Sequence, residues 1–277
     1  MPTSTIPVAG ARLYVVDDGS PSDPPIVLLH AAIADSRSWD ALAPRLTEAG
    51  YRVIRRDMRG FGQTESDDVD YSHRADIVAV LDALGIERAV LVGNSAGGQI
   101  AIDTAIEFPN RVVAVVGVAP GLGGFEVDIP PEEAALFEEG ERLEAADPLD
   151  ADAVVDFEVR LWVDGRRQPP DRVPAAIREA VREMDLVHYE PGRDRGRSIR
   201  LQPPAAARLG ELRVPVLAVA GALDVSDVAA TVQHLAADAP DARAVVLPGV
   251  AHMIGMEAPE RLAELIVDFL APLPRWR

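Results

Sequence analysis

The sequence predicts an α/β fold, a mostly parallel, doubly wound sheet interrupted by a helical insertion. Short β-branched runs alternate with segments whose apolar residues recur at helical spacing, which is the rhythm of βαβ units. The strand-like runs are apolar almost throughout, as in Pro25–His30, which is typical of strands covered by helices on both faces. The rhythm stops over residues 121–200 and then resumes, so the insertion divides a single domain.

The first half of the chain supplies the opening βα units. A helix over Ser38–Ala49 is expected to end at Gly50, because glycine readily adopts the left-handed conformation that closes a helix. A second helix carries an apolar stripe and ends near Gly85, and a third follows Ser95. The strands expected here are Leu13–Val16, Pro25–His30, Tyr51–Arg56, Ala89–Val92 and Val112–Val118.

The second half begins with the insertion, where no convincing strand is visible. One amphipathic helix is marked by Ile177, Val181 and Met184, with Pro174 at its start, where a missing N–H costs little. The βα rhythm then returns, with expected elements at Pro215–Ala220, 228–237, Arg243–Leu247 and a last helix with an apolar stripe around Ile266. We therefore expect a core domain of residues 1–120 and 201–277, and a helical cap over residues 121–200.

The composition of the 277 residues restricts the chemistry. Cysteine is absent and all 27 basic residues are arginine, which excludes disulfides, thiolate nucleophiles, lysine Schiff bases and the P-loop lysine. The net charge of −18 argues against nucleic acid or an anionic membrane surface as a partner. No apolar run reaches the roughly 18 residues of a membrane span, and Met1–Gly10 does not resemble an export signal. A cytoplasmic enzyme is the prediction.

The strongest local pattern is Gly93-Asn94-Ser95-Ala96-Gly97, between a strand and a helix. A nucleophile on such a turn has a strained backbone, and its neighbours two positions away must be small. Ser95 would also stand at a helix N-terminus, where unpaired N–H groups favour developing negative charge. The alternative is an ordinary glycine turn that begins a helix.

A base and an acid are predicted from their positions at the carboxyl edge of the sheet. His252, among the five histidines, lies in the loop directly after a late strand; His73 and His234 are expected on the solvated surface. Asp224 follows the strand Pro215–Ala220 and would orient the imidazole, while Asp227 is the alternative acid. The chain order is Ser, Asp, His.

The chain resembles the α/β-hydrolase fold superfamily over essentially its full length. Its loop His30-Ala31, with Ser36–Asp40, looks closest to enol-lactonase-like and related small-substrate esterases. His30-Ala31-Ala32, followed by Trp39, resembles the family's His-Gly-x loop, with Ala31 in place of the glycine. This match implies oxyanion donors at the N–H of Ala32, or of Ala31, and of Ala96. The segment Asp57–Thr64 resembles a family loop that is usually structural, and the insertion corresponds to the cap that covers the pocket.

The resulting prediction is a serine hydrolase that cleaves a small carboxylic ester or lactone through an acyl-enzyme on Ser95, with water as co-substrate and without metal or cofactor. The resemblance associates dehalogenases and epoxide hydrolases with Asp at this position, so serine disfavours both. Ala31, Trp162 and His188 are candidate pocket residues, and the acidic run Glu132–Glu144 is expected to be a solvated helix face. Three further cap side chains are weaker candidates for the pocket: Phe137, Leu161 and Met184.

Three other readings remain open at this point. The same three residues would serve a hydrolase of carbon–carbon bonds in a diketone-like substrate. A lyase or a ligand-binding protein on the same fold is also compatible with the pattern. Dinucleotide binding is not expected, because Gly121–Gly124 lacks the G-x-G-x-x-G spacing and is better explained as a hinge into the cap.

Overall fold

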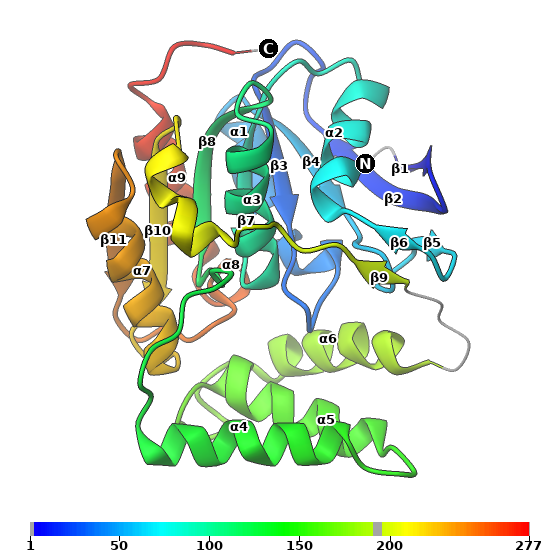
Figure 1. Ribbon diagram of the computed structural model, residues 1–277, viewed down its shortest axis with the longest axis vertical. Helices are drawn as coiled ribbons and strands as arrows, with labels where there is room; N and C mark the ends of the chain where they lie inside the picture. Colours follow the sequence, from blue (N-terminus) through cyan, green and yellow to red (C-terminus); the bar gives the residue numbers. More distant parts are fainter. Residues whose placement is uncertain (1–2, 191–195, 277) are drawn as a thin grey trace.

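The computed structural model describes residues 3–190 and 196–276, and it shows a twisted sheet with helices on both faces (Figure 1). Within the described residues the main sheet has the strand order β1-β2-β4-β3-β7-β8-β10-β11, with β5 paired to β2. Strands β4 to β11 along this order run parallel, while β1 and β2 are antiparallel. The strands are β1 (Thr3–Val8), β2 (Ala11–Asp18), β3 (Pro25–Leu29), β4 (Arg52–Arg56), β5 (Glu65–Ser66), β6 (Asp70–Tyr71), β7 (Ala89–Asn94), β8 (Val112–Val118), β9 (Arg197–Ser198), β10 (Val216–Gly221) and β11 (Ala242–Leu247).

The helices cover the sheet as a doubly wound fold requires. The path from β3 to β4 runs along the sheet in the opposite direction to the path from β7 to β8, so right-handed crossovers place α1 and α3 on opposite faces. Helix α1 packs on α9, and α3 packs on α2. The helices are α1 (Ala43–Glu48), α2 (His73–Ala83), α3 (Ala96–Glu107), α4 (Pro131–Glu144), α5 (Ala151–Glu158), α6 (Ala175–Leu186), α7 (Ser226–Asp238), α8 (Ile254–Glu257) and α9 (Pro259–Leu270), with shorter turns η1 (Ser36–Trp39), η2 (Val159–Asp164), η3 (Val187–Tyr189) and η4 (Ala205–Glu211).

The predicted fold class is confirmed, and the structure differs from the expectation in local details. The expected helix over Ser38–Ala49 is two pieces, η1 and α1, because Pro44 lacks an N–H and its ring would clash with the turn before it. Strand β1 was not expected, since its residues are mostly exposed and lack a buried apolar run. The insertion, in which no strand was expected, holds the two-residue strand β9, which pairs with β6.

Helices α4, α5 and α6, with turns η2 and η3, form what we call the helical layer (residues 131–189), below the sheet in Figure 1. Residues 191–195 of the predicted cap lie outside the described residues. The layer shares a small apolar core with the loop after β3, built from Val155, Val163 and Val181 against Ala31 and Ile33. The layer is therefore packed onto the sheet through side chains at one edge.

That edge is where the parallel strands end, and it is the expected place for a site in an open α/β sheet. The loops that follow β3, β7, β10 and β11 carry His30, Ser95, Asp224 and His252. Because β7 lies between β3 and β8, Ser95 stands near the centre of the edge. Among the described residues, no helix is long and apolar enough to cross a bilayer.

Candidate active site

The turn between β7 and α3 has the strained geometry predicted for a nucleophile. Ser95 has φ +54° and ψ −116°, a conformation that side-chain-bearing residues rarely adopt. A Cβ on Gly93 would lie 2.1 Å from the carbonyl oxygen of Gly97, and one on Gly97 would lie 2.2 Å from that of Leu29. The two glycines are therefore needed for the close approach of α3 to the strands, and a Ser95 N–H bond to the Val118 carbonyl (3.0 Å) fixes the turn.

His252 and Asp224 form a buried pair at the same edge. The Nδ1 atom of His252 lies 2.8 Å from Oδ2 of Asp224, and the two residues are only 4% and 5% exposed. The Val225 N–H donates to the other oxygen of Asp224 (2.9 Å), which holds the carboxylate in place. An ionised Asp224 accepts the Nδ1–H proton, so the neutral imidazole carries its lone pair on Nε2, the tautomer that a general base needs.

A residue that the sequence reasoning left without a role links the turn to the histidine loop. The Asn94 side chain is buried and donates to the carbonyl oxygens of Val118 (3.1 Å) and His252 (3.2 Å). One amide thus ties together the ends of β7 and β8 and the loop after β11. The signal for it was local, since Asn94 directly precedes the candidate nucleophile at the end of a buried strand.

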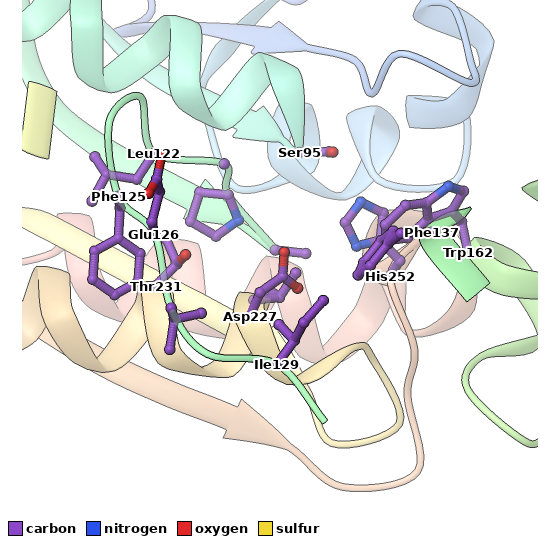
Figure 2. A pocket seen from close by; sticks show the side chains of 15 residues that line it. Ser95, Leu122, Phe125, Glu126, Ile129, Phe137, Trp162, Asp227, Thr231 and His252 are labelled. Atoms are coloured by element: carbon purple, nitrogen blue, oxygen red, sulfur yellow. The ribbon is translucent and has the colours of Figure 1, made fainter. Parts of the chain in front are cut away.

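Ser95 and His252 line one pocket of about 590 Å³, here called the first pocket (Figure 2). Trp162 packs its ring against His252 at a centroid distance of 4.6 Å, and Phe137 also lines the wall. Both come from the helical layer. Within the described residues, no hydrogen bond joins the Ser95 hydroxyl to His252, although both side chains border the same space.

Ala32 and Ala96, the expected oxyanion donors, line an adjoining second pocket of about 660 Å³. Ala96 is the first residue of α3, where N–H groups have no partner within the helix. Among the described residues, neither the N–H of Ala32 nor that of Ala96 donates a hydrogen bond. Both donors are consequently available to a negatively charged oxygen.

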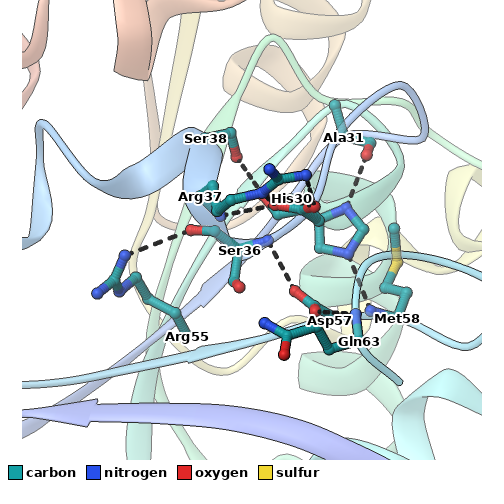
Figure 3. A network of polar contacts seen from close by, with 10 residues as sticks. His30, Ala31, Ser36, Arg37, Ser38, Arg55, Asp57, Met58 and Gln63 are labelled. Carbon is teal, nitrogen blue, oxygen red and sulfur yellow. Dashed lines mark hydrogen bonds and ion pairs between the residues drawn. The ribbon is translucent and has the colours of Figure 1, made fainter. Parts of the chain in front are cut away.

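A polar network holds the loop that carries Ala32 (Figure 3). The Met58 N–H donates to Nε2 of His30 (2.9 Å), so His30 carries its proton on Nδ1 and donates it to the Ala31 carbonyl (2.8 Å). Full burial lowers the pKa of His30, which favours this neutral form. Asp57 adds a second bridge, because its carboxylate accepts the N–H groups of Ser36 (2.8 Å) and Gln63 (2.7 Å).

Other candidate pocket residues lie elsewhere. Ala31 is buried against the helical layer, and its carbonyl oxygen accepts the hydrogen bond from His30. His188 stacks on Phe61 at 4.4 Å and lines neither of the two pockets. Leu161 belongs to the apolar core, and Met184 borders a separate surface groove. For the three residues of the layer, only the tertiary structure shows which side faces Ser95.

Two histidines expected on the surface are not simply solvated. Burial lowers the pKa of His73 to about 3, and its Nδ1 is enclosed in the wall of the second pocket. His234 stacks on Phe125 (4.3 Å) and pairs with Asp238 (2.6 Å). Both lie on amphipathic helices whose packing partners come from distant segments.

The acidic run Glu132–Glu144, expected to be a solvated helix face, contains one glutamate that is not solvated. Glu133 is completely buried, and its carboxylate accepts the N–H (2.8 Å) and the hydroxyl (2.7 Å) of Ser226. It also pairs with Arg166. Since Ser226 begins α7 two residues after Asp224, this glutamate fastens the helical layer to the acid loop. No periodicity distinguished it from its neighbours.

Asp227, the alternative acid, lines the first pocket, in the first turn of α7. It does not bond the imidazole; within the described residues, Asp224 is the carboxylate that bonds His252. The described residues contain no group of three His, Cys, Asp or Glu side chains arranged to hold a metal ion.

Comparison with known proteins agrees with this architecture. A model of the alpha/beta hydrolase fold matches residues 24–259. The chain belongs to the α/β-hydrolase fold family. It is 28% identical to epoxide hydrolase A of Mycobacterium tuberculosis, over 95% of each chain, and 28% identical to a rhodomycin D methylesterase of Streptomyces, over 96% of this chain and 97% of the relative. The structure of an N-acyl homoserine lactone degrading enzyme superposes with a TM-score of 0.73 at 26% identity, covering 96% of this chain and 99% of the other. Relatives of this kind support a hydrolase that acts on a small molecule.

Proposed function

We propose that this α/β hydrolase is a serine esterase or lactonase that cleaves a small carboxylic ester through an acyl-enzyme on Ser95. The observation that carries the proposal is the strained Ser95 in a pocket that it shares with His252, whose Nδ1 is held 2.8 Å from Asp224. A nucleophile, a correctly oriented base and two available N–H groups are the requirements of acyl transfer.

In the proposed reaction, Nε2 of His252 accepts the hydroxyl proton as Oγ of Ser95 attacks the carbonyl carbon. The N–H groups of Ala32 and Ala96 stabilise the oxyanion, and Asp224 stabilises the imidazolium. When the intermediate collapses, the carbon–oxygen bond breaks and the alcohol leaves with the proton from His252. Water then attacks the acyl group, His252 takes its proton, and the acid departs as Ser95 is reprotonated.

Although the chain is similar to an epoxide hydrolase, we do not propose epoxide hydrolysis, for a chemical reason. A carboxylate that opens an epoxide forms an ester, which water cleaves to regenerate the enzyme. A serine hydroxyl would form an ether, which has no carbonyl for water to attack, so the enzyme would be trapped after one event. With Ser95 at the turn, we infer that the substrate carries the carbonyl itself.

The two pockets beside Ser95 suit small substrates, since volumes of about 590 and 660 Å³ lie within the range of small-molecule sites. The helical layer supplies Phe137 and Trp162 to the wall, which supports its proposed role as a cap of residues 121–200. A cytoplasmic enzyme is the accompanying proposal, and the net charge of −18, which disfavours an anionic membrane surface as a partner, supports it.

The decisive experiment is to label the protein with a fluorophosphonate and to screen short acyl esters, lactones, diketones and styrene oxide, using Ser95→Ala as the matched control. We expect labelling of the native protein alone, and ester or lactone turnover that falls by about 10⁴-fold or more in the variant. Turnover of diketones without esters would support a carbon–carbon bond hydrolase instead. Absence of both labelling and turnover would favour a ligand-binding protein or a lyase.

A further inference from the structure

The first pocket has an unbalanced charge distribution. Its lining includes the carboxylates of Asp227 and Glu126, and none of its described lining residues is an arginine. The chain has no lysine, so His252, the proposed catalytic base, is the one basic side chain among those lining residues. The second pocket differs, because Arg74 and Arg200 line it together with Asp103.

Asp227 is the half-buried member of the acidic pair, and Glu126 is exposed. It receives the backbone N–H of Val228, while its Oδ1 atom is buried and accepts no hydrogen bond from the described residues. Among the described residues, no basic side chain forms an ion pair with Asp227, whereas Glu133 pairs with Arg166. An anionic group in this position gains stability when a cation enters the adjacent space.

The position of Asp227 connects it to the reaction centre. Figure 2 shows its side chain directed from α7 toward the space bounded by Ser95 and His252. Burial raises the pKa of the Asp227 carboxyl, and the neighbouring Asp224 raises it further, while the Val228 N–H and His252 oppose the shift. Asp227 lies in the first turn of α7, three residues after Asp224, and lines the same pocket as His252.

The remaining wall is aromatic. Phe125, Phe137 and Trp162 line the same pocket, with Phe137 and Trp162 separated by 6.2 Å between ring centroids. Aromatic faces attract cations through the ring quadrupole, and the effect increases when the cation loses water. Carboxylates and aromatic rings together are the chemistry that recognises an ammonium group, whereas a carboxylate-bearing ligand would be repelled.

The proton path indicates which part of an ester enters this pocket. In the proposed mechanism His252 must give its proton to the leaving oxygen, so the alcohol portion lies on the side of His252. His252 lines the first pocket, while the oxyanion donors Ala32 and Ala96 line the second. This orientation assigns the alcohol to the first pocket and the acyl chain to the second.

We propose that the first pocket is a subsite for a cationic alcohol, a quaternary or protonated amine, recognised by Asp227 and the aromatic wall. This inference rests on the proposed function, which it deepens by naming the substrate class. Glu126 stands at the exposed rim of both pockets and adds negative charge at the entrance.

The test compares isosteric esters at about pH 8, well above the ordinary pKa of a carboxyl group. Acetylcholine and 3,3-dimethylbutyl acetate differ by nitrogen for carbon in the alcohol. Ethyl 4-(trimethylammonio)butyrate and ethyl 5,5-dimethylhexanoate place the same difference in the acyl chain. We expect kcat/KM about tenfold higher for the cation in the alcohol pair and a ratio near one in the acyl pair.

Asp227→Asn should reduce the alcohol-pair ratio to near one. Asp268→Asn, an equal charge change at an exposed residue of α9, should leave both the ratio and the activity unchanged. A native ratio near one, or a ratio that Asp227→Asn does not change, would overturn the subsite while leaving the esterase proposal intact.

Calorimetry separates the subsite from the reaction. Choline should bind the native protein more tightly than 3,3-dimethylbutan-1-ol does, by about tenfold, and Asp227→Asn should remove the difference. If no ester is hydrolysed, the proposed function fails, but the binding measurement still tests the subsite. Tighter binding of choline that depends on Asp227 supports the cation subsite. Equal binding of the two alcohols overturns it.

Discussion

The sheet edge and the helical layer border the same pocket but are held in different ways. At the sheet edge, a backbone hydrogen bond fixes Ser95, while the Val225 N–H, the Asn94 amide and their mutual contact hold Asp224 and His252. The helical layer contributes apolar rings, Phe137 and Trp162, and is fastened to the core by the hydrogen bonds from Ser226 to Glu133 and by apolar packing.

This difference suggests that the sheet edge serves the proposed reaction and that the helical layer serves substrate selectivity. Reacting groups need positions accurate to a fraction of an ångström, and backbone-held strand ends can supply that accuracy. A pocket wall needs only shape and polarity, which side chains on packed helices provide. Substitutions at the sheet edge should therefore act on kcat, and those in the layer on stability or KM.

The largest expected effect is at the sheet edge. Asp224→Asn should lower kcat on the best ester by about 10⁴-fold, because an amide stabilises the wrong imidazole tautomer. Steady-state kinetics with a thermal unfolding curve measure this. Asp268→Asn is the matched control and should retain full activity. An Asp224→Asn enzyme with kcat within threefold of the native value would show that another group orients His252.

The attachment of the layer is next in magnitude. Glu133→Ala should lower the free energy of unfolding by about 3 kcal/mol, since it leaves Arg166 and the Ser226 N–H without their buried partner. Urea denaturation measures the change. Glu132→Ala removes an exposed neighbour paired with Arg167, and should cost less than about 0.5 kcal/mol. Equal losses in the two variants would contradict the distinction between the buried and the exposed glutamate.

A smaller effect is expected at the pocket wall. Trp162→Ala should reduce kcat/KM by about tenfold, mainly through KM, because the apolar surface over the substrate and His252 is lost. Trp162→Phe should recover most of the loss by restoring a ring. Should kcat fall with KM unchanged, Trp162 would act on the reacting groups, and the proposed division between edge and layer would not hold.

The smallest effect concerns the pH dependence of the layer. Burial and the neighbouring Glu158 raise the pKa of Asp185 to about 9, so the folded state binds its proton more tightly than the unfolded state does. Stability should then fall as pH rises from the unfolded value toward the folded one. Asp185→Asn should raise Tm by a few degrees at about pH 8 and leave it unchanged below about pH 4, as measured by calorimetry. A constant difference at all pH values would exclude this titration.

Much of the site could be predicted from local sequence. Gly93 and Gly97 signalled the turn because a Cβ at either position collides with backbone, a constraint that depends on neighbours within one supersecondary unit. Asp224 and His252 could be placed because both follow strands of a parallel sheet, whose carboxyl ends meet at one edge. The prediction of one helix over Ser38–Ala49 is wrong because Pro44 interrupts it, and that interruption is a local feature of the sequence.

Other features depend on contacts that span the chain. The burial of Glu133 requires Ser226, 93 positions away, and Asn94 reaches His252 across 158 positions, so no window of sequence reveals either contact. The contact of His188 is also long-range: its place in the insertion made it a pocket candidate, but it packs on Phe61.

The amino-acid sequence by itself determined the α/β fold, the exclusion of cysteine and lysine as nucleophiles and the order of the three candidate residues, because periodicity, turn chemistry and composition are local properties. Only the tertiary structure decided which carboxylate bonds His252, which rings face Ser95 and where negative charge lies uncompensated in the pocket. Those features depend on how the helical layer packs over the sheet edge, which is set by the contacts between distant segments.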